Sequence, residues 1–480
     1  MKRQSLTNNF LFQFAYQILI TFIPLIISPY LTRTIGSKGL GVYAYSYSIA
    51  YYFVMFANLG IVKYGQRLIS ENSHDERSLR KAFWSLYTIH GIFSVFAIVF
   101  YLLFVTLFIS DNLRIYYIQT FYVASALFDI TWFFYGLENF KSVVVKNTVI
   151  KILECVLIFL LVKNENDLWK YAVIVSCGLM LGQVVMIPQA MDIAKPIKFS
   201  KKDLTAHIKP MIILSVAVVA VSLYTVFDKT LLGLMTTKEN VAFYEYSNKI
   251  INIPKAIIGV IGTVTFPRAC KMLEQNNYSG HKVCMHDSLV LTCLIGFASV
   301  FGLMAVAEPL AVLYYGKDFA PCAGVIKSLA PIIIIVELSA ILRMQYLIPK
   351  KMDKSYTICI CLNAAVNLVL SFSLIPVLGI NGAVAGTMAA ELFGLFYQLR
   401  LCREVITGGD ILREVIPFSL IGAIMFAAVR IALGKMEQTW FSLIIEIVIG
   451  GAVYTVLSVI YMLIFEKPFV NRILKKLSFR

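Results

Sequence analysis

The chain has 480 residues, of which 59% are hydrophobic and 15% charged, and its mean hydropathy is +0.78. This composition is typical of a polytopic membrane protein and excludes the soluble and disordered classes. The formal net charge is +16. The positions of the basic residues, given below, favour contact with anionic lipid over contact with nucleic acid.

Fourteen stretches have the length and apolar character that a helix needs to cross a bilayer. In chain order they cover residues 9–31, 41–61, 83–108, 115–135, 143–162, 168–190, 210–235, 242–266, 288–313, 325–347, 355–375, 380–402, 415–433 and 440–465. The first follows a short basic segment, Met1–Arg3, and is too long for a signal peptide, so we expect it to be retained. The fold class predicted is therefore an all-α polytopic membrane protein with about fourteen spans.

The basic residues are divided unequally between the two sides of these predicted spans. The termini and the loops after even-numbered spans contain 26 Lys and Arg, whereas the loops after odd-numbered spans contain 7. Cytoplasmic loops of membrane proteins carry the excess of positive charge. The count predicts that both termini are cytoplasmic and supports an even number of spans.

The sequence also contains a weak internal repeat. Residues Leu40–Ser46 align with Val241–Ser247, and Lys141-Ser142 before span 5 align with Lys354-Ser355 before span 11. Because each copy holds six spans, the two copies have the same orientation and are related by an axis along the membrane normal. We predict an N-lobe at 1–200, a C-lobe at 201–410 and a C-terminal helix pair at 411–480, with a substrate site between the lobes.

At least five acidic and five basic side chains fall inside the predicted spans, and ten of them are singled out. A charge at mid-bilayer costs about 2.5–3.5 kcal/mol on insertion scales, so such residues are typical of substrate or ion pathways. They indicate a hydrated cavity and hence transport. The acids are Asp129, Glu154, Asp228, Glu337 and Glu391, and the bases are Lys151, Lys229, Lys249, Lys255 and Arg343.

Span 8 carries polar residues on one helical face, among them Asn248, Lys249, Asn252 and Lys255. This spacing predicts a cavity wall that presents cations to an anionic substrate. The alternative is a helix near the interface whose lysines extend toward the headgroups. Arg33, at the outer end of span 1, is a further candidate for a phosphate contact, and its alternative is also an interfacial anchor.

Other polar residues within spans have two interpretations each. Asn363 and Asn367 on span 11 suit sugar binding or interhelical hydrogen bonding. Tyr47 and Tyr51 on span 2 suit stacking on sugar rings or an interfacial aromatic belt. The remaining candidates, Asp228 with Lys229 and Lys151 with Glu154, suit cavity-lining roles or structural ion pairs.

The sequence contains no nucleotide-binding loop, no catalytic set and no cysteine or histidine spacing for a metal. His281 and His286 are assigned to a solvated basic loop. We therefore expect no enzyme activity, no cofactor and no metal. Embedded carboxylates are the natural carriers of a coupling ion, because binding a proton or Na⁺ removes much of their burial cost. Asp129, Glu154 and Asp228 are the candidates, with Asp129 and Glu154 preferred.

Four segments resemble bacterial polysaccharide-unit flippases, of the superfamily of multidrug, oligosaccharidyl-lipid and polysaccharide exporters. The segments are Pro29–Tyr43, Asn58–Arg67, Asp129–Phe140 and Gly379–Thr387. The resemblance implies two six-helix lobes related by a pseudo-two-fold axis along the membrane normal, plus two C-terminal helices. The implied location is the bacterial cytoplasmic membrane.

The implied cargo is an undecaprenyl-pyrophosphate-linked oligosaccharide, moved from the inner to the outer leaflet by alternating access. Lys229, Lys249, Lys255, Arg33 and Arg343 are then candidates for pyrophosphate binding. The implied partners are the lipid-linked oligosaccharide and membrane lipid, with the polysaccharide polymerase and chain-length proteins as further candidates. A lipid II-type flippase, a drug or cation exporter of the same superfamily and a non-transporting membrane enzyme or assembly scaffold are the alternatives. The basic face of span 8 argues against a cation exporter, and the short loops argue against an enzyme.

Overall fold

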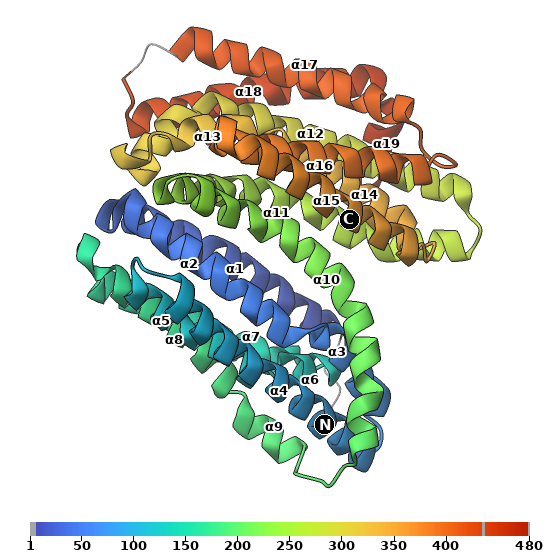
Figure 1. Cartoon of the computed structure of the whole chain (residues 1–480). Helices are drawn as coiled ribbons and strands as arrows, with labels where there is room; N and C mark the ends of the chain where they lie inside the picture. The colour runs from blue at the N-terminus through green and yellow to red at the C-terminus, as the bar shows by residue number, and fades with distance from the viewer. Residues whose placement is uncertain (1–5, 434–436, 479–480) are drawn as a thin grey trace. The chain divides into compact units, whose positions relative to one another are not determined.

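The computed structural model describes residues 6–433 and 437–478, and within these ranges the chain is all-helical, with no β-strand. The basic segment Met1–Arg3 therefore lies outside the described residues. The chain divides into two compact units, Met1–Ala242 and Phe243–Arg480, each of which is described by itself. Figure 1 shows the helices of both units with their labels.

The helices of the first unit pack largely side by side along their lengths, with α1 against α2 and α7, and α5 against α8. Its elements are α1 (Leu6–Thr34), α2 (Gly36–Asn58), α3 (Ile61–Asn72), α4 (Glu76–Phe108), α5 (Leu113–Ser125), η1 (Ala126–Phe128), α6 (Thr131–Gly136), α7 (Phe140–Leu161), η2 (Glu165–Asp167), α8 (Leu168–Val184), α9 (Ile187–Ile193) and α10 (Lys201–Met235). The predicted lobe boundary at 200 differs from the unit boundary, because α10 packs on α2 and α4. The lobes are defined by the repeat, so that division stays a prediction.

In the second unit, α15 packs along α16, and the C-terminal helices α17 and α18 pack on each other and on α12 (Figure 1). The elements are α11 (Lys238–Glu274), which begins in the first unit, α12 (Tyr278–Leu310), η3 (Ala311–Tyr315), η4 (Lys317–Phe319), α13 (Cys322–Leu329), α14 (Ile332–Leu342), η5 (Arg343–Leu347), α15 (Asp353–Leu378), α16 (Ile380–Leu401), α17 (Gly408–Leu433), α18 (Trp440–Phe465) and α19 (Lys467–Ser478). Prolines lie within several of these helices, including Pro254 in α11.

Each predicted span coincides with one long helix or with a run of shorter ones. Nine helical segments in the described part of the chain are long and apolar enough to cross a membrane. The predicted spans outside these nine are 9–31, 115–135, 143–162, 210–235 and 380–402. The multi-pass helical class is confirmed, whereas the number of fourteen stays a prediction.

Several residues that lie between the predicted spans are helical. Residues 61–72 form α3, α11 continues to Glu274, and α12 begins at Tyr278, so the expected basic loop after span 8 shrinks to 275–277. The assignment of His281 and His286 to a solvated loop is therefore wrong, since both lie on α12. His281 is fully buried, and its Nε2 lies 2.7 Å from the Gln345 carbonyl oxygen.

Local sequence explains where several helices begin outside the apolar spans. The Asp75 carboxylate accepts hydrogen bonds from the backbone N–H groups of Arg77 and Ser78, which caps α4. Ser200 and Asp203 form a reciprocal capping box at the start of α10. The Asp203 carboxylate accepts a hydrogen bond from the Ser200 backbone N–H and lies 2.9 Å from the Lys81 ammonium. These two contacts lower the pKa of the Asp203 carboxyl to about 2.

Glycine permits a close approach within the first unit, where α2 meets the start of α11. A Cβ atom at Gly41 would lie 1.8 Å from the Lys238 carbonyl oxygen, an impossible separation. We therefore expect Gly41→Ala to destabilise the protein by about 1–3 kcal/mol or more, because a backbone atom must move. Thermal unfolding of the purified protein measures this effect. Gly91→Ala is the matched control, since its nearest neighbour is a side-chain atom at 3.8 Å, and an equal loss in both variants would contradict the prediction.

Candidate functional site

A polar seam joins α2 to α10 in the first unit. The Tyr51 hydroxyl lies 3.1 Å from Ser222 Oγ, and the Tyr52 hydroxyl lies 3.0 Å from Thr230 Oγ1. Thr230 in turn donates to Ser48 Oγ at 3.1 Å. Tyr51 was predicted from the sequence as a sugar contact, whereas the hydroxyls on α10 were not. Ser48 and Ser222 are buried and the other three residues are partly buried, so the seam consists of hydroxyl groups that bond to one another between the two helices.

Asp228 lies beside this seam and is 1% exposed. It is within electrostatic range of the Tyr52 hydroxyl. Its neighbour Lys229 is only partly buried. The two side chains therefore meet different surroundings on α10, and a carboxylate at this depth needs compensating polar contacts.

Tyr47 belongs to a stack of aromatic rings in the first unit. Its ring lies parallel to that of Tyr122, with centroids 4.6 Å apart and an interplanar angle of 10°. Tyr43 stacks on it from the same helix. Between these two tyrosines in the sequence lies Tyr45, and the Lys238 ammonium is 3.4 Å from the centroid of its ring. The tyrosine rings of α2 thus make stacking contacts with other rings and a cation–π contact with Lys238.

Glu154 on α7 is buried, and its Oε2 atom is 2.7 Å from the Lys151 ammonium. The ion pair foreseen between these two residues is therefore present. The second carboxylate oxygen, Oε1, is buried without a hydrogen-bond donor among the described residues. It points at Gly178 of α8, where a Cβ atom would lie only 2.0 Å away. The glycine creates the space in which this oxygen sits.

Asp129 lies at a break between two short helices, η1 and α6. Its Oδ1 accepts hydrogen bonds from the N–H and the hydroxyl of Thr131, at 2.9 and 2.6 Å. Within electrostatic range lies His90 of α4, which is fully buried. Neither ring nitrogen of His90 has a hydrogen-bond partner among the described residues. Sequence reasoning missed His90, although an isolated histidine in a strongly apolar stretch was the available signal.

The three candidate ion carriers thus occupy separate environments of the first unit. Asp129 faces a threonine and a histidine, Glu154 a lysine and a glycine, and Asp228 a tyrosine hydroxyl. Arg33, also in this unit, is exposed and donates to the Pro29 carbonyl oxygen at 2.9 Å. This contact lies within the last turn of α1.

In the second unit, the polar face of α11 is half-accessible. The Asn248 side chain donates to the Tyr244 carbonyl oxygen at 3.1 Å, and the Lys249 ammonium lies 3.9 Å from the centroid of the Tyr246 ring. Asn252 is exposed. These residues follow one another along α11, and the cavity wall predicted from their spacing stays a prediction.

Lys255 is the centre of a charged cluster within the second unit. The carboxylates of Glu337 and Glu391, on α14 and α16, lie within electrostatic range of its ammonium. Both carboxylates are also within range of Arg343, which begins η5. Among the described residues, none of these pairs is as close as 4.0 Å, so the charges compensate one another without locking into direct ion pairs. The structure therefore brings Lys255 and Arg343 together, as two cations with two acids between three helices.

Asn363 and Asn367 are buried between α15 and α16. Asn367 donates to the hydroxyls of Ser371 and Thr387, at 3.4 Å each. A Cβ atom at Gly394 of α16 would lie 2.2 Å from Asn363 Nδ2, so the two helices pack closely there. The bond from Asn367 to Thr387 is an interhelical hydrogen bond between α15 and α16, and a role of either asparagine in sugar binding stays a prediction.

Two solved structures share the architecture of this chain. One is the lipid II flippase MurJ in an inward closed conformation, with a TM-score of 0.77 and 16% identity over 95% of this chain and 99% of that chain. The other is an inward-facing multidrug resistance MATE family transporter of the MOP superfamily, with a TM-score of 0.58 and 12% identity over 87% of this chain and 96% of that chain. The chain therefore has the fold of these two structures.

The family follows from the sequence itself. A model described as polysaccharide biosynthesis protein matches residues 6–273, more than half of the chain, and the chain belongs to that family. A putative O-antigen transporter of Shigella dysenteriae is 27% identical over 58% of this chain and 69% of its own length. Another, from Escherichia coli strain K12, is 21% identical over 83% of this chain and 97% of its own length. These relatives are named as transporters and not as catalytic enzymes.

Proposed function

We propose that this protein is a flippase that moves an oligosaccharide repeat unit, linked to undecaprenyl pyrophosphate, from the inner to the outer leaflet of the bacterial cytoplasmic membrane by alternating access. The observation that carries the proposal is the family match over residues 6–273, joined to the likeness to two putative O-antigen transporters. Its partners are the lipid-linked oligosaccharide and membrane lipid, with the polymerase and chain-length proteins of polysaccharide assembly as further candidates.

The embedded groups suit such a cargo. A pyrophosphate needs cations, and Lys255 and Arg343 supply them beside carboxylates that keep the site nearly neutral when it is empty. Lys249, Lys229 and Arg33 are further contacts in this proposal. The hydroxyl and amide groups of α2 and α11 suit sugar, with Tyr47, Tyr51, Asn248 and Asn252 as the accessible candidates.

Transport against a gradient needs a source of energy, and we propose that an ion supplies it. Asp129 and Glu154 remain the preferred carriers, with Asp228 as the third candidate. The support is structural: Glu154 keeps one carboxylate oxygen without a donor, and Asp129 lies near a buried histidine with two nitrogens without partners. A proton or Na⁺ bound to such an oxygen lowers the cost of keeping a carboxylate in the membrane.

The transport proposal is tested most directly with purified protein in liposomes. A fluorescent polyprenyl-pyrophosphate oligosaccharide is placed in both leaflets, and the fraction that an impermeant quencher can reach is followed over time. We expect fast exchange of this lipid with the protein and slow exchange without it. Lipid II, tested in parallel, separates the lipid II-type alternative. Exchange rates equal to those of empty liposomes for both lipids would refute the proposed function.

The proposed topology places both termini in the cytoplasm. A reporter that is active only outside the cytoplasm, fused after Arg480, should therefore be silent, whereas one fused within the connection 434–439 should be active. The physical reason is the excess of Lys and Arg on one side, 26 against 7. Strong activity of the C-terminal fusion would contradict both the orientation and the even number of spans.

A further inference from the structure

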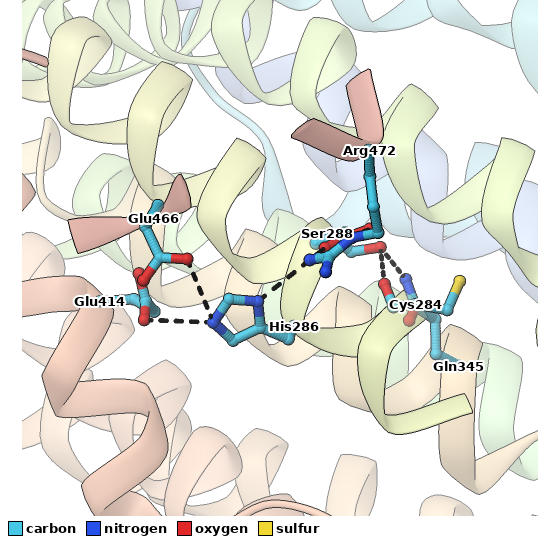
Figure 2. Close-up of polar contacts among 8 residues, drawn as sticks. Cys284, His286, Ser288, Gln345, Glu414, Glu466 and Arg472 are labelled. Carbon is cyan, nitrogen blue, oxygen red and sulfur yellow. Dashed lines mark hydrogen bonds and ion pairs between the residues drawn. The ribbon is translucent and has the colours of Figure 1, made fainter. Parts of the chain in front are cut away.

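Three side chains from separate helices converge at one end of the second unit. His286 lies in the third turn of α12, Glu414 in the second turn of α17, and Glu466 directly after α18. One nitrogen of the imidazole and one oxygen of each carboxylate all lie within 4.8 Å of one another. Figure 2 shows both carboxylates directed toward the same imidazole nitrogen.

The spacing within this cluster is wide for hydrogen bonds. His286 Nε2 is 3.5 Å from Glu414 Oε1 and 3.7 Å from Glu466 Oε2, whereas an N–H to oxygen bond is normally about 2.7–3.2 Å. Ligand atoms about 2.0–2.1 Å from a tetrahedral Zn²⁺ are about 3.3–3.4 Å from one another. The two nitrogen–oxygen distances are close to that edge length, and the two carboxylate oxygens, which lie within 4.8 Å of each other, need to approach by at most about 1.5 Å to share a tetrahedral ion.

Glu414 supplies an independent indication of a ligand. The side chain is 1% exposed, and neither of its carboxylate oxygens has a hydrogen-bond partner among the described residues. A buried carboxylate without donors is costly, and such groups are normally paired or coordinate metals. Because Oε1 is directed at the imidazole, the oxygen that lacks a donor faces the space where the ion would lie.

The surroundings of the imidazole also suit metal binding. Its other nitrogen, Nδ1, faces the Asp287 carboxylate at 3.9 Å, and Asp287 is held by the Arg472 guanidinium of α19 through two hydrogen bonds. This separation is too long for a hydrogen bond, so the ring must move toward Asp287 before that carboxylate can orient it as outer carboxylates orient histidine ligands. His286 is 38% exposed at its side chain, which gives an ion a path from solvent.

We propose that His286, Glu414 and Glu466 form a binding site for a divalent transition-metal ion of the Zn²⁺ class. One imidazole and two carboxylates are ligands that Zn²⁺ accepts, and the fourth position remains open to water. The bound ion would join α12 to both helices of the C-terminal pair. The proposal is independent of the cargo, since it concerns only residues at one end of the second unit.

The test uses the full-length protein, purified in detergent, stripped with a chelator and titrated with Zn²⁺. We expect about one tightly bound Zn²⁺ per chain and a rise in the unfolding temperature on binding. Glu414→Gln and His286→Asn should weaken binding by more than about 100-fold, since each removes a direct ligand rather than an outer-shell partner. Co²⁺ in place of Zn²⁺ should give the intense visible absorption of a tetrahedral site, and this band should be absent in both variants.

Glu274→Gln is the matched control, because Glu274 is an exposed acid at the end of α11 in the same unit. It should bind Zn²⁺ as the unsubstituted protein does. If Glu414→Gln fails to fold, Glu466→Gln replaces it. Zn²⁺ binding that is absent in the unsubstituted protein, or that is equally tight in the His286 and Glu466 variants, would overturn the proposal and leave an ionic cluster around a protonated imidazole.

Discussion

Lys255→Ala should abolish the export of polysaccharide to the cell surface while the protein still reaches the membrane. The ammonium lies among Glu337, Glu391 and Arg343, and a pyrophosphate would use the same positive charge that these carboxylates compensate. Lys255→Arg should restore part of the export, because arginine retains the charge and adds a geometry suited to phosphate. The measurement is the amount of surface polysaccharide, with protein levels determined in the same cells.

A loss of export in Lys255→Ala could also follow from two carboxylates left without their cation. A buried carboxylate is costly to keep charged when no cation lies nearby. The double variant Lys255→Met with Glu391→Gln removes one charge of each sign and separates the two causes. If it exports normally, Lys255 serves only to compensate the carboxylate. If it is folded and inactive, as we expect, the ammonium acts on the cargo.

Glu154→Gln should make flipping insensitive to an imposed proton or Na⁺ gradient. The glutamine retains the size of the side chain, so the space opposite Gly178 stays filled, but an amide cannot gain or lose the charge that an ion neutralises. We expect unsubstituted protein in liposomes to flip faster under one of the two gradients and the variant to flip at one rate under both. Glu165→Gln, an exposed acid in η2, is the matched control and should respond as the unsubstituted protein does.

The competing interpretation is an ion pair between Lys151 and Glu154 that only stabilises α7. It predicts that Lys151→Met with Glu154→Gln retains the response to a gradient. It also predicts a lower unfolding temperature for Glu154→Gln alone, because Lys151 would remain without its partner. Gradient sensitivity retained in Glu154→Gln would exclude this residue as the ion carrier, and Asp129→Asn would then be the next variant to examine.

The long helices could be predicted from the sequence because apolar length is a direct requirement of the bilayer. The breaks could not. Span 115–135 divides at Asp129, whose carboxylate accepts a hydrogen bond from the Thr131 N–H at the start of the short helix that follows. Helix α3 is amphipathic rather than uniformly apolar, so a search for spans assigned its residues to a loop. Such features depend on local capping and on packing against other helices, which periodicity does not report.

The part of the candidate site that could be predicted from the sequence is the set of charged residues within apolar stretches. A lysine or glutamate in an apolar stretch is visible in the sequence, and Lys255 and Glu154 were found in this way. Their surroundings were not visible, because Glu337 and Glu391 come from distant helices and Gly178 has no side chain to notice. His286 was assigned to solvent for the same reason, since its partners Glu414 and Glu466 are remote in sequence.

Pro254 lies in α11 directly before Lys255 and one turn after Ile250. Proline has no N–H, so the Ile250 carbonyl oxygen lacks the backbone partner that it would have in an uninterrupted helix. A helix bends most readily at such a point. Lys249 precedes Pro254 and Lys255 follows it, so any bending of α11 at the proline would change the separation of their ammonium groups. The affinity for a cargo with two phosphates would depend on that separation. The bend of one helix would then control how tightly the proposed cargo is bound.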